Sequence, residues 1–282
     1  RDLHLSLRRQ RQMCIRDRQG TFSQAAAVNQ FGNDCDLRDC DSIDDVFSIV
    51  ASEEVDYGVV PVENSTEGAV NNTQDCLVDS TVQIVGEVIL PIQHCLLTKP
   101  GAETNEIEKI ASHKQSLAQC RNWIQQSFPQ AELIECPSNA QAAKLVLGDN
   151  SIAAIAGSLA AKVYGLSIRQ EQIQDQHHNS TRFLVLANHS TESSGNDKTS
   201  ILIYTENRPG ALFRILKPFE SLQVSLTKIE TRPAKNEAWA YVFFIDFEGH
   251  VNDETIIELF RKLVACTAEI KILGSYPIFV SS

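Results

Sequence analysis

The stretch "DYGVVPVENSTEGAVNNTQDCLVDS" (residues 56–80) joins a strand pattern to a helix pattern through a polar cluster. Its opening, "DYGVVPVE", is short and rich in β-branched residues, which is typical of a strand. Its end, "GAVNNTQDCLVDS", predicts a helix. The cluster between them holds the side chains of Glu63, Asn64 and Ser65. Because ligands of open parallel sheets bind beyond the carboxyl ends of strands, this cluster is a candidate binding site.

Helix and strand patterns alternate outward from this stretch, from Gly20 to Leu186. "TFSQAAAVNQFG" predicts a helix that ends at Gly32. "KQSLAQCRNWIQQSF" (residues 114–128) predicts one continuous helix, and "VQIVGEVIL" (residues 82–90) predicts a strand. Such alternation indicates an α/β fold with mostly parallel sheets covered by helices.

The pattern changes after a polar segment at residues 189–198, "HSTESSGNDK", which predicts a linker. Residues 199–282 then show strands and helices in the order βαββαβ, the ferredoxin-like split motif. Within this part we expect Pro209 at the first position of a helix, followed by Gly210. The chain is therefore predicted to have a second, smaller domain.

Composition limits the classes of function. The net charge of −11 argues against a nucleic-acid partner, and no apolar run approaches the ~20 residues that a membrane span needs. The eight cysteines are scattered without a C-x-x-C pair, so we expect no metal and reduced thiols. We expect no secretory signal and a cytoplasmic location.

The first residues differ from the rest. "RRQRQMCIRDR" (residues 8–18) shows no buried-strand pattern, because arginine dominates it. We expect residues 1–18 to be a non-native or disordered lead-in, such as translated sequencing adaptor joined to an incomplete gene.

Four polar clusters lie where predicted strands end. Backbone N–H groups at helix starts favour anions there, and hydroxyl and amide side chains add neutral donors. Taken singly, each residue has an ordinary structural role, such as a helix cap, a satisfied histidine or a surface ion pair. The candidate site residues are Thr21, Ser23, Glu63, Asn64, Ser65, His113, Gln115, Asn179, Thr181 and Arg182.

Together these segments resemble a known family. "GTFSQAA", "VPVENSTEGAV", "SHKQSLAQC" and "NSTRFLVL" are similar, in that order, to segments of prephenate dehydratase, and the likeness spans residues 19–282. "NRPGAL" and "KIETRP" resemble the segments of its ACT regulatory domain that bind phenylalanine. The closing "LGSYP" is similar to the end of bifunctional proteins that join chorismate mutase to the dehydratase. The chain therefore resembles either a dehydratase with an ACT domain or the dehydratase–ACT part of such a bifunctional protein.

The resemblance implies a fold of two lobes like the type II periplasmic binding proteins, followed by the ACT domain. The dehydratase domain would span 19–188. Its first lobe would hold residues 19–90 and 170–188, and its second lobe residues 91–169. The ACT domain would span 199–282.

The resemblance also implies a reaction. Prephenate would lose carbon dioxide and water to give phenylpyruvate in L-phenylalanine biosynthesis, without metal or organic cofactor. By its place in the T-R-F segment, Thr181 is the candidate donor to the leaving hydroxyl. Neutral donors suit the ring carboxylate, because a strongly cationic clamp would stabilise the charged ground state and oppose decarboxylation.

The other residues would hold the substrate. Arg182 has two open roles, to grip the pyruvyl carboxylate or to brace the cleft through Glu63. His113 and Gln115 would orient the wall of the second lobe. The residues expected to position the carboxylates are Thr21, Ser23, Asn64 and Ser65, with Asn179 in the same segment as Thr181.

In the ACT segment, the resemblance implies phenylalanine as an allosteric inhibitor. Glu230 would meet the ammonium group, and Thr231 departs from the serine usual in the family. The resemblance also implies a homodimer or homotetramer formed through the ACT domains. The effector carboxylate would bind a loop and first helical turn formed by Asn207, Pro209, Gly210, Ala211 and Leu212.

Two alternatives stay open. An arogenate dehydratase would show almost the same core motifs, and assaying both substrates separates the two. A non-catalytic amino-acid-binding regulatory protein would bind phenylalanine without turning over prephenate.

Overall fold

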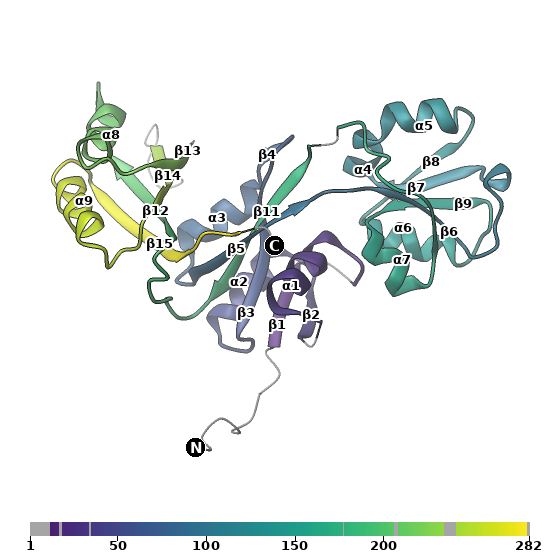
Figure 1. The fold of residues 1–282 in the computed structure, drawn as a ribbon, viewed down its shortest axis with the longest axis horizontal. Coiled ribbons are helices and arrows are strands. Elements are labelled where there is room, and N and C mark those ends of the chain that lie inside the picture. The colour runs from purple at the N-terminus through teal and green to yellow at the C-terminus, as the bar shows by residue number, and fades with distance from the viewer. Residues whose placement is uncertain are drawn as a thin grey trace, which may run out of the picture.

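The computed structural model describes residues 12–16, 19–33, 35–176, 178–205, 208–233 and 241–280. Three sheets follow one another along the long axis of the molecule (Figure 1). The first lobe lies in the middle, the second lobe on one side and the C-terminal domain on the other (Figure 1). In the described part of the chain, no helix is long and apolar enough to cross a membrane.

The sheet of the first lobe has the strand order β2-β1-β3-β11-β5, and β4 pairs with β3. β1 runs parallel to β2 and β3, whereas β11 lies antiparallel between β3 and β5. The strands are β1 (Gln12–Arg16), β2 (Asp36–Cys40), β3 (Tyr57–Asn64), β4 (Gly68–Ala69), β5 (Gln83–Pro91) and β11 (Ser180–Ala187). The helices are α1 (Phe22–Phe31), α2 (Ile43–Ala51) and α3 (Asn71–Asp79).

β1 corrects the expectation that the arginine-rich lead-in holds no strand. Met13, Cys14 and Ile15 are fully buried between β2 and β3. Only these three residues of β1 are apolar, so the run is too short to show a period in the sequence. The non-native origin of residues 1–18 stays a prediction, and 1–11, 17 and 18 lie outside the described residues.

The expectation of reduced thiols is wrong at one pair, because Cys14 of β1 and Cys40 of β2 form a disulfide. Three other cysteines, Cys95, Cys120 and Cys136, are buried free thiols. Burial raises the pKa of Cys120 to about 12, so this thiol stays protonated near neutral pH.

The second lobe has the strand order β10-β6-β9-β7-β8. β7 runs parallel to β8 and β9, whereas β6 is antiparallel to β9 and β10. The strands are β6 (Cys95–Thr98), β7 (Lys109–His113), β8 (Glu132–Cys136), β9 (Ile152–Ala156) and β10 (Ser167–Gln170). The helices are η1 (Thr104–Glu106), α4 (Lys114–Gln119), α5 (Arg121–Ser127), α6 (Asn139–Val146) and α7 (Ser158–Tyr164).

The helix predicted over residues 114–128 is broken at Cys120, which separates α4 from α5. The backbone N–H groups of Asn122 and Trp123 donate to the carboxylate of Asp175 at 3.0 and 3.1 Å. A carboxylate at this place caps a new helix start. Asp175 is far away in sequence, so the local pattern did not reveal the break.

The expectation of mostly parallel sheets is only partly right. The chain crosses between the lobes after β5 and again between β10 and β11, and the strands at these crossings pair antiparallel. β10 ends at Gln170 and belongs to the sheet of the second lobe. Residue 170, predicted to begin the returning part of the first lobe, therefore lies in the second lobe.

The C-terminal domain has the strand order β13-β14-β12-β15 and confirms the predicted βαββαβ order. α8 begins after Gly210, whose φ of 77° is left-handed, so Pro209 precedes the helix instead of occupying its first position. β12 begins at Asp197, inside the predicted linker. The elements are β12 (Asp197–Thr205), α8 (Ala211–Ser221), β13 (Leu226–Pro233), β14 (Tyr241–Glu248), α9 (Glu254–Val264) and β15 (Glu269–Pro277).

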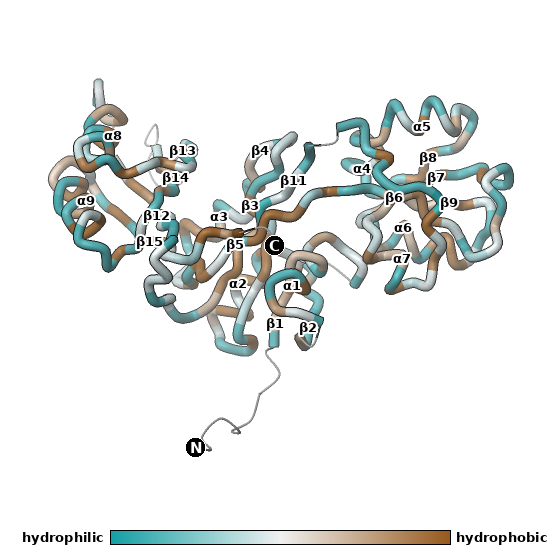
Figure 2. The backbone as a smooth tube through the Cα atoms, in the orientation of Figure 1, coloured by the Kyte–Doolittle hydropathy of each residue, from teal (hydrophilic) through white to brown (hydrophobic). Residues whose placement is uncertain are grey.

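The C-terminal sheet packs tightly on the first lobe. Its Leu202, Phe244 and Leu273 share one hydrophobic core with Ile84 and Leu184 of the lobe. Figure 2 shows that most residues along β5 are hydrophobic. A Cβ on Gly274 of β15 would overlap the backbone carbonyl of Ile84. The first lobe and the C-terminal sheet therefore form one packed body.

Candidate active site

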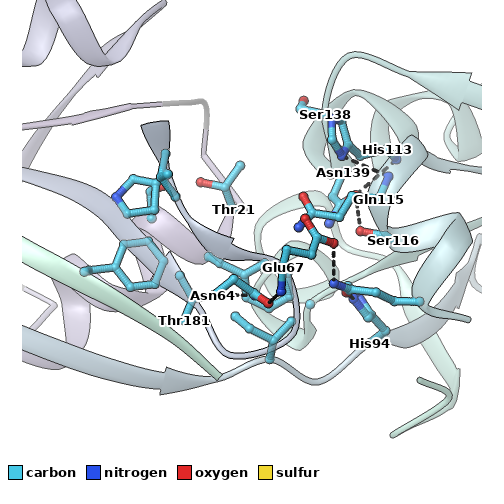
Figure 3. A pocket seen from close by; sticks show the side chains of 18 of the residues that line it. Thr21, Asn64, Glu67, His94, His113, Gln115, Ser116, Ser138, Asn139 and Thr181 are labelled. Atoms are coloured by element: carbon cyan, nitrogen blue, oxygen red, sulfur yellow. Dashed lines mark hydrogen bonds between the residues drawn. The ribbon is translucent and has the colours of Figure 1, made fainter. Parts of the chain in front are cut away.

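A cavity of about 370 Å³ lies between the two lobes (Figure 3). This volume is within the range of small-molecule sites. The lining side chains of the first lobe include Thr21, Phe22, Ser23, Asn64, Glu67, Thr181 and Phe183. The polar lining side chains of the second lobe and of the segment that leads into it are His94, His113, Gln115, Ser116, Gln119, Ser138 and Asn139.

Thr181 and Asn64 face each other at the floor of this cavity (Figure 3). They are paired in register on β11 and β3, and Asn64 Nδ2 donates to Thr181 Oγ1 at 2.9 Å. Asn64 Oδ1 accepts from the backbone N–H and hydroxyl of Thr66 and from Glu67 N. These bonds fix the amide so that its nitrogen points to Thr181, which leaves the Thr181 hydroxyl proton available to a ligand.

Helix starts from both lobes converge on the cavity. Thr21 is the N-cap of α1, His113 of α4, and Ser138 of α6, and all three line the cavity. Helix N-termini carry partial positive charge and unpaired N–H groups. The cavity is therefore suited to an anionic ligand.

The cavity offers this positive potential without cationic side chains. Among the described residues that line it, none is lysine or arginine. In the described part of the chain, His, Cys, Asp and Glu side chains form no cluster that could hold a metal ion. Neutral hydroxyl and amide donors therefore dominate the lining.

The structure brings six of the sequence-predicted site residues together. They lie on β3, β11, the start of α1 and the start of α4. These residues are Thr21, Ser23, Asn64, His113, Gln115 and Thr181. Four others, Glu63, Ser65, Asn179 and Arg182, lie outside the lining.

Arg182 requires a correction, since it does not line the cavity, and its guanidinium forms its ion pairs with Glu87 and Asp246 although Glu63 is its neighbour on β3. Successive strand residues point to opposite faces, so Arg182 lies on the face opposite Thr181. Its Nε donates to Glu87 at 2.7 Å and its Nη1 to Asp246 of the C-terminal domain at 2.6 Å. Its Nη2 donates to the hydroxyl of Tyr276 at 2.8 Å.

The charge of Arg182 is compensated within this buried cluster. Burial acts to lower the pKa of Arg182, but the attraction of its three partners outweighs burial and raises the pKa above its ordinary value. Lys198 adds a second cation, 2.7 Å from Glu87 Oε1. Glu63 pairs instead with Lys228 of the C-terminal domain at 3.0 Å.

Ser65 and Asn179 act beside the cavity and not in its lining. Ser180 N donates to Ser65 Oγ at 2.9 Å, and Ser65 N donates to Ser180 O. Ser65 Oγ also lies 3.5 Å from Asn179 Oδ1. These bonds tie the end of β3 to the start of β11, next to Thr181.

Sequence reasoning missed several polar residues of the lining. Gln119 lies four residues after Gln115, so helical spacing places both on one face. Asn139 Oδ1 accepts from three donors of the second lobe, which leaves its Nδ2 to donate toward the cavity. The missed residues are Glu67, His94, Ser116, Gln119, Ser138 and Asn139.

His94 lies where the chain enters the second lobe and is 1% exposed. Its Nε2 is 2.8 Å from Gln119 Oε1, and its Nδ1 has no hydrogen-bond partner among the described residues. Burial lowers the pKa of His94, although the bond to Gln119 opposes the shift.

The two lobes are in direct contact beside the start of α1. Tyr164 Oη of α7 donates to the backbone carbonyl of Gln19 at 2.6 Å. A Cβ on Gly20, whose φ is +90°, would lie 2.9 Å from the Tyr164 ring and 3.2 Å from Ala160 Cα. A side chain at Gly20 would therefore push the lobes apart.

The predicted effector residues fall into two places. Pro209 lines a cavity of about 600 Å³ with Arg208, Arg214 and the segment after α9. Gly210 is the N-cap of α8, and Ala211 and Leu212 are its first two residues. Asn207 lies outside the described residues. Glu230 lies on the sheet face turned to the first lobe, where its carboxylate accepts from Gln74 Nε2 at 2.6 Å.

Comparison with known proteins agrees with this geometry. The prephenate dehydratase family model matches residues 17–191, and the ACT domain model matches residues 199–265. The bifunctional chorismate mutase/prephenate dehydratase of Pseudomonas aeruginosa is 48% identical over 92% of this chain and 71% of that protein. The prephenate dehydratase of Methanocaldococcus jannaschii is 38% identical over 92% of this chain and 96% of that protein.

A solved structure shares the fold. The prephenate dehydratase of Arthrobacter aurescens in complex with L-Phe superimposes with a TM-score of 0.87 and 32% identity. The match covers 95% of this chain and 90% of that one. The chain therefore belongs to the prephenate dehydratase family and carries an ACT domain after its two lobes.

Proposed function

We propose that the cavity between the lobes converts prephenate to phenylpyruvate, carbon dioxide and water. One observation carries the proposal: Asn64 donates to Thr181 inside a cavity of neutral donors. Since Asn64 occupies a lone pair of Thr181 Oγ1, the Thr181 hydroxyl proton is free to point at the substrate. Thr181 is the catalytic residue in this proposal.

The leaving group is the ring hydroxyl, which departs as water once it gains a proton. Thr181 donates a hydrogen bond to that oxygen while the bond from the ring carbon to its carboxylate breaks. The electron pair of this bond completes the aromatic ring, the hydroxyl leaves with its own bonding pair, and one proton, passed on by the Thr181 hydroxyl and replaced from solvent, converts it to water. Because aromatisation drives the step, a weak acid in a site sheltered from water suffices.

The lining supports differential binding of the two substrate carboxylates. The ring carboxylate must lose its charge in the reaction, so neutral donors such as Thr21 and Ser23 hold it without favouring the ground state strongly. The pyruvyl carboxylate keeps its charge, and the start of α6 with Asn139 Nδ2 offers it N–H donors. Phe22 and Phe183 supply apolar walls for the ring.

We propose that phenylalanine inhibits this reaction through the ACT domain in L-phenylalanine biosynthesis. The complex with L-Phe of the Arthrobacter aurescens relative supports the choice of effector. The buried cluster around Arg182 supports the route, because it joins Asp246 of the ACT sheet to the residue next to Thr181.

We further propose a homo-oligomer formed through the ACT domains. Phe213 and Leu212 on α8 are 69% and 39% exposed, which is unusual for large apolar side chains side by side. Light scattering at several protein concentrations, with and without phenylalanine, measures the assembly. A monomer in every condition would contradict the proposal.

A turnover assay tests the function. Purified protein is given prephenate or arogenate, with and without phenylalanine, and phenylpyruvate or phenylalanine is quantified. We expect phenylpyruvate from prephenate and a lower rate with phenylalanine. Turnover of arogenate but not of prephenate would identify the protein as an arogenate dehydratase. Phenylalanine binding without any turnover would indicate a regulatory protein.

A further inference from the structure

A chain of hydrogen bonds crosses the cleft and ends at the catalytic threonine. On the far side, His94 Nε2 lies 2.8 Å from Gln119 Oε1. Gln119 Nε2 then donates across the cleft to Glu67 Oε1 at 3.1 Å. Glu67 N donates to Asn64 Oδ1 at 3.3 Å, and Asn64 Nδ2 donates to Thr181.

The direction of each bond in this chain is fixed by chemistry. An ionised carboxylate only accepts, so Gln119 presents its amide nitrogen to Glu67. Its amide oxygen is then left for His94, which must carry its proton on Nε2. Reversing the Gln119 amide would place its oxygen against the Glu67 carboxylate and break that contact.

The Gln119 amide is held by a residue on its own side of the cleft. His94 is buried, and its backbone N–H donates to Gln174 Oε1 at 3.0 Å. The Gln119 amide is therefore oriented by a rigid neighbour. Forming the bond to Glu67 restricts mainly one additional side chain, which lowers its entropic cost.

Glu67 in turn belongs to the turn that orients Asn64. Asn64 Oδ1 accepts from Thr66 N at 2.9 Å and from Glu67 N at 3.3 Å. A displacement of this turn removes the bonds that keep the Asn64 nitrogen directed at Thr181. The position of Glu67 and the orientation of the Thr181 hydroxyl are thus linked through adjacent bonds.

We propose that Glu67 and Gln119 form a closure latch, which couples the approach of the two lobes to the orientation of Thr181. Glu67, Gln119 and His94 are positioning residues in this account, because they act through Asn64 and not on the substrate. The proposal deepens the proposed dehydratase function and rests on it. The contact beside Gly20 and Tyr164 and the edge-on packing of Phe22 on His94 also join the lobes, so the latch is one of several contacts across the cleft.

A charge swap tests the latch. Gln119→Glu places two carboxylates face to face at the cleft rim, and we expect kcat/KM for prephenate to fall about tenfold, as ~1.4 kcal/mol of repulsion predicts. Glu67→Gln keeps an acceptor for Gln119 and should therefore lose less activity than Gln119→Glu does. The double variant restores a donor and an acceptor, because the carboxylate introduced on α4 accepts from both His94 and the amide introduced on the facing turn. It should therefore recover activity.

A second readout does not need turnover. Hydrogen–deuterium exchange of the peptide that spans residues 64–69 reports the bonds of Thr66 N and Glu67 N. We expect faster exchange in Gln119→Glu and wild-type exchange in the double variant, with melting temperatures unchanged in all three. Glu67→Ala, at an exposed position, should lower kcat without changing the melting temperature.

The outcomes separate the two proposals. Rescue in both the rate and the exchange supports the latch. Variants that match the wild type, or a loss in Gln119→Glu that the double variant does not repair, overturn the latch and leave the dehydratase function intact. If the wild type turns over neither prephenate nor arogenate, the proposed function fails, and the exchange experiment still decides whether the bridge couples to Asn64.

Discussion

At the scale of single residues, two neighbours on β11 serve opposite sides of the sheet. Thr181 faces the cavity and Arg182 faces the ACT sheet, because side chains alternate along a strand. The sequence motifs predicted that Thr181 and Asn64 share a site, and the two side chains are hydrogen-bonded to each other. The motifs did not predict the partners of Arg182, because Asp246 and Tyr276 come from a separate domain.

The hydroxyl of Thr181 is predicted to be essential, while its methyl group is not. Thr181→Ala should lower kcat by about 10²–10⁴, the usual range for removing a positioned proton donor. Thr181→Ser keeps the donor and should retain activity within roughly tenfold. Steady-state kinetics with prephenate measures both, with the exposed Thr227→Ala as a matched control. Equal rates for the alanine and serine variants would contradict the role of the hydroxyl.

His94 is predicted to make folding stability depend on pH. Its pKa is lowered in the folded protein by burial, so the unfolded chain takes up a proton at higher pH than the folded chain does. The contribution is fully present above the ordinary histidine pKa of about 6.5 and is lost as the pH falls below it. The free energy of unfolding, measured with urea, should decrease from about pH 7 to about pH 5. This decrease should be smaller by about 1 kcal/mol in His94→Gln than in the wild type. The same pH dependence in both proteins would contradict this assignment.

At the scale of elements, the sequence predicted what local pattern determines. The helix predicted to end at Gly32 and the strand predicted at residues 82–90 are both present, as α1 and β5. β1 was missed because three buried apolar residues among arginines carry no periodic signal. The break at Cys120 was missed because Asp175, which caps α5, is brought there only by the fold.

The end of α3 depends on a lysine from the ACT sheet. Lys271 Nζ donates to the backbone carbonyls of Leu77, Val78 and Ser80 at 2.6–2.9 Å. A cation at a helix C-terminus satisfies unpaired carbonyls and opposes their partial charge. Lys271→Met should lower the free energy of unfolding by about 1–3 kcal/mol, whereas the exposed Lys217→Met should change it by less than about 0.5 kcal/mol. Indistinguishable urea midpoints for the two variants would rule out this capping role.

At the scale of the whole molecule, the first lobe and the ACT sheet form one body and the second lobe faces it across the cavity. Gly274 against Ile84 and the shared core leave little room for sliding between the first two. If the ACT domain regulates the cavity as proposed, the packed junction directs its effect through β11 and β5 rather than through a loose linker. Sequence patterns placed the domains but not this junction, since its contacts join residues far apart in the chain.

The ion cluster at this junction is predicted to be far more important for stability than a surface pair. Arg182→Leu leaves Glu87 and Asp246 buried with less compensation and should cost about 3–5 kcal/mol. Arg38→Leu breaks the pair with Glu54, in which both side chains are 54% exposed, and should cost less than about 1 kcal/mol. Chemical denaturation measures the free energy of unfolding of both variants. Similar losses in the two would contradict the larger stabilisation assigned to the buried cluster.

Turnover of prephenate by the purified chain, compared with its Thr181→Ala variant, tests the assignment of the cavity most directly. Phenylpyruvate formation is followed in both proteins after their melting temperatures are shown to agree. We predict rapid formation by the wild type and a rate lower by about 10²–10⁴ in the variant. Equal turnover by both proteins, or none by a folded wild type, would contradict the assignment of this cavity as a prephenate dehydratase site.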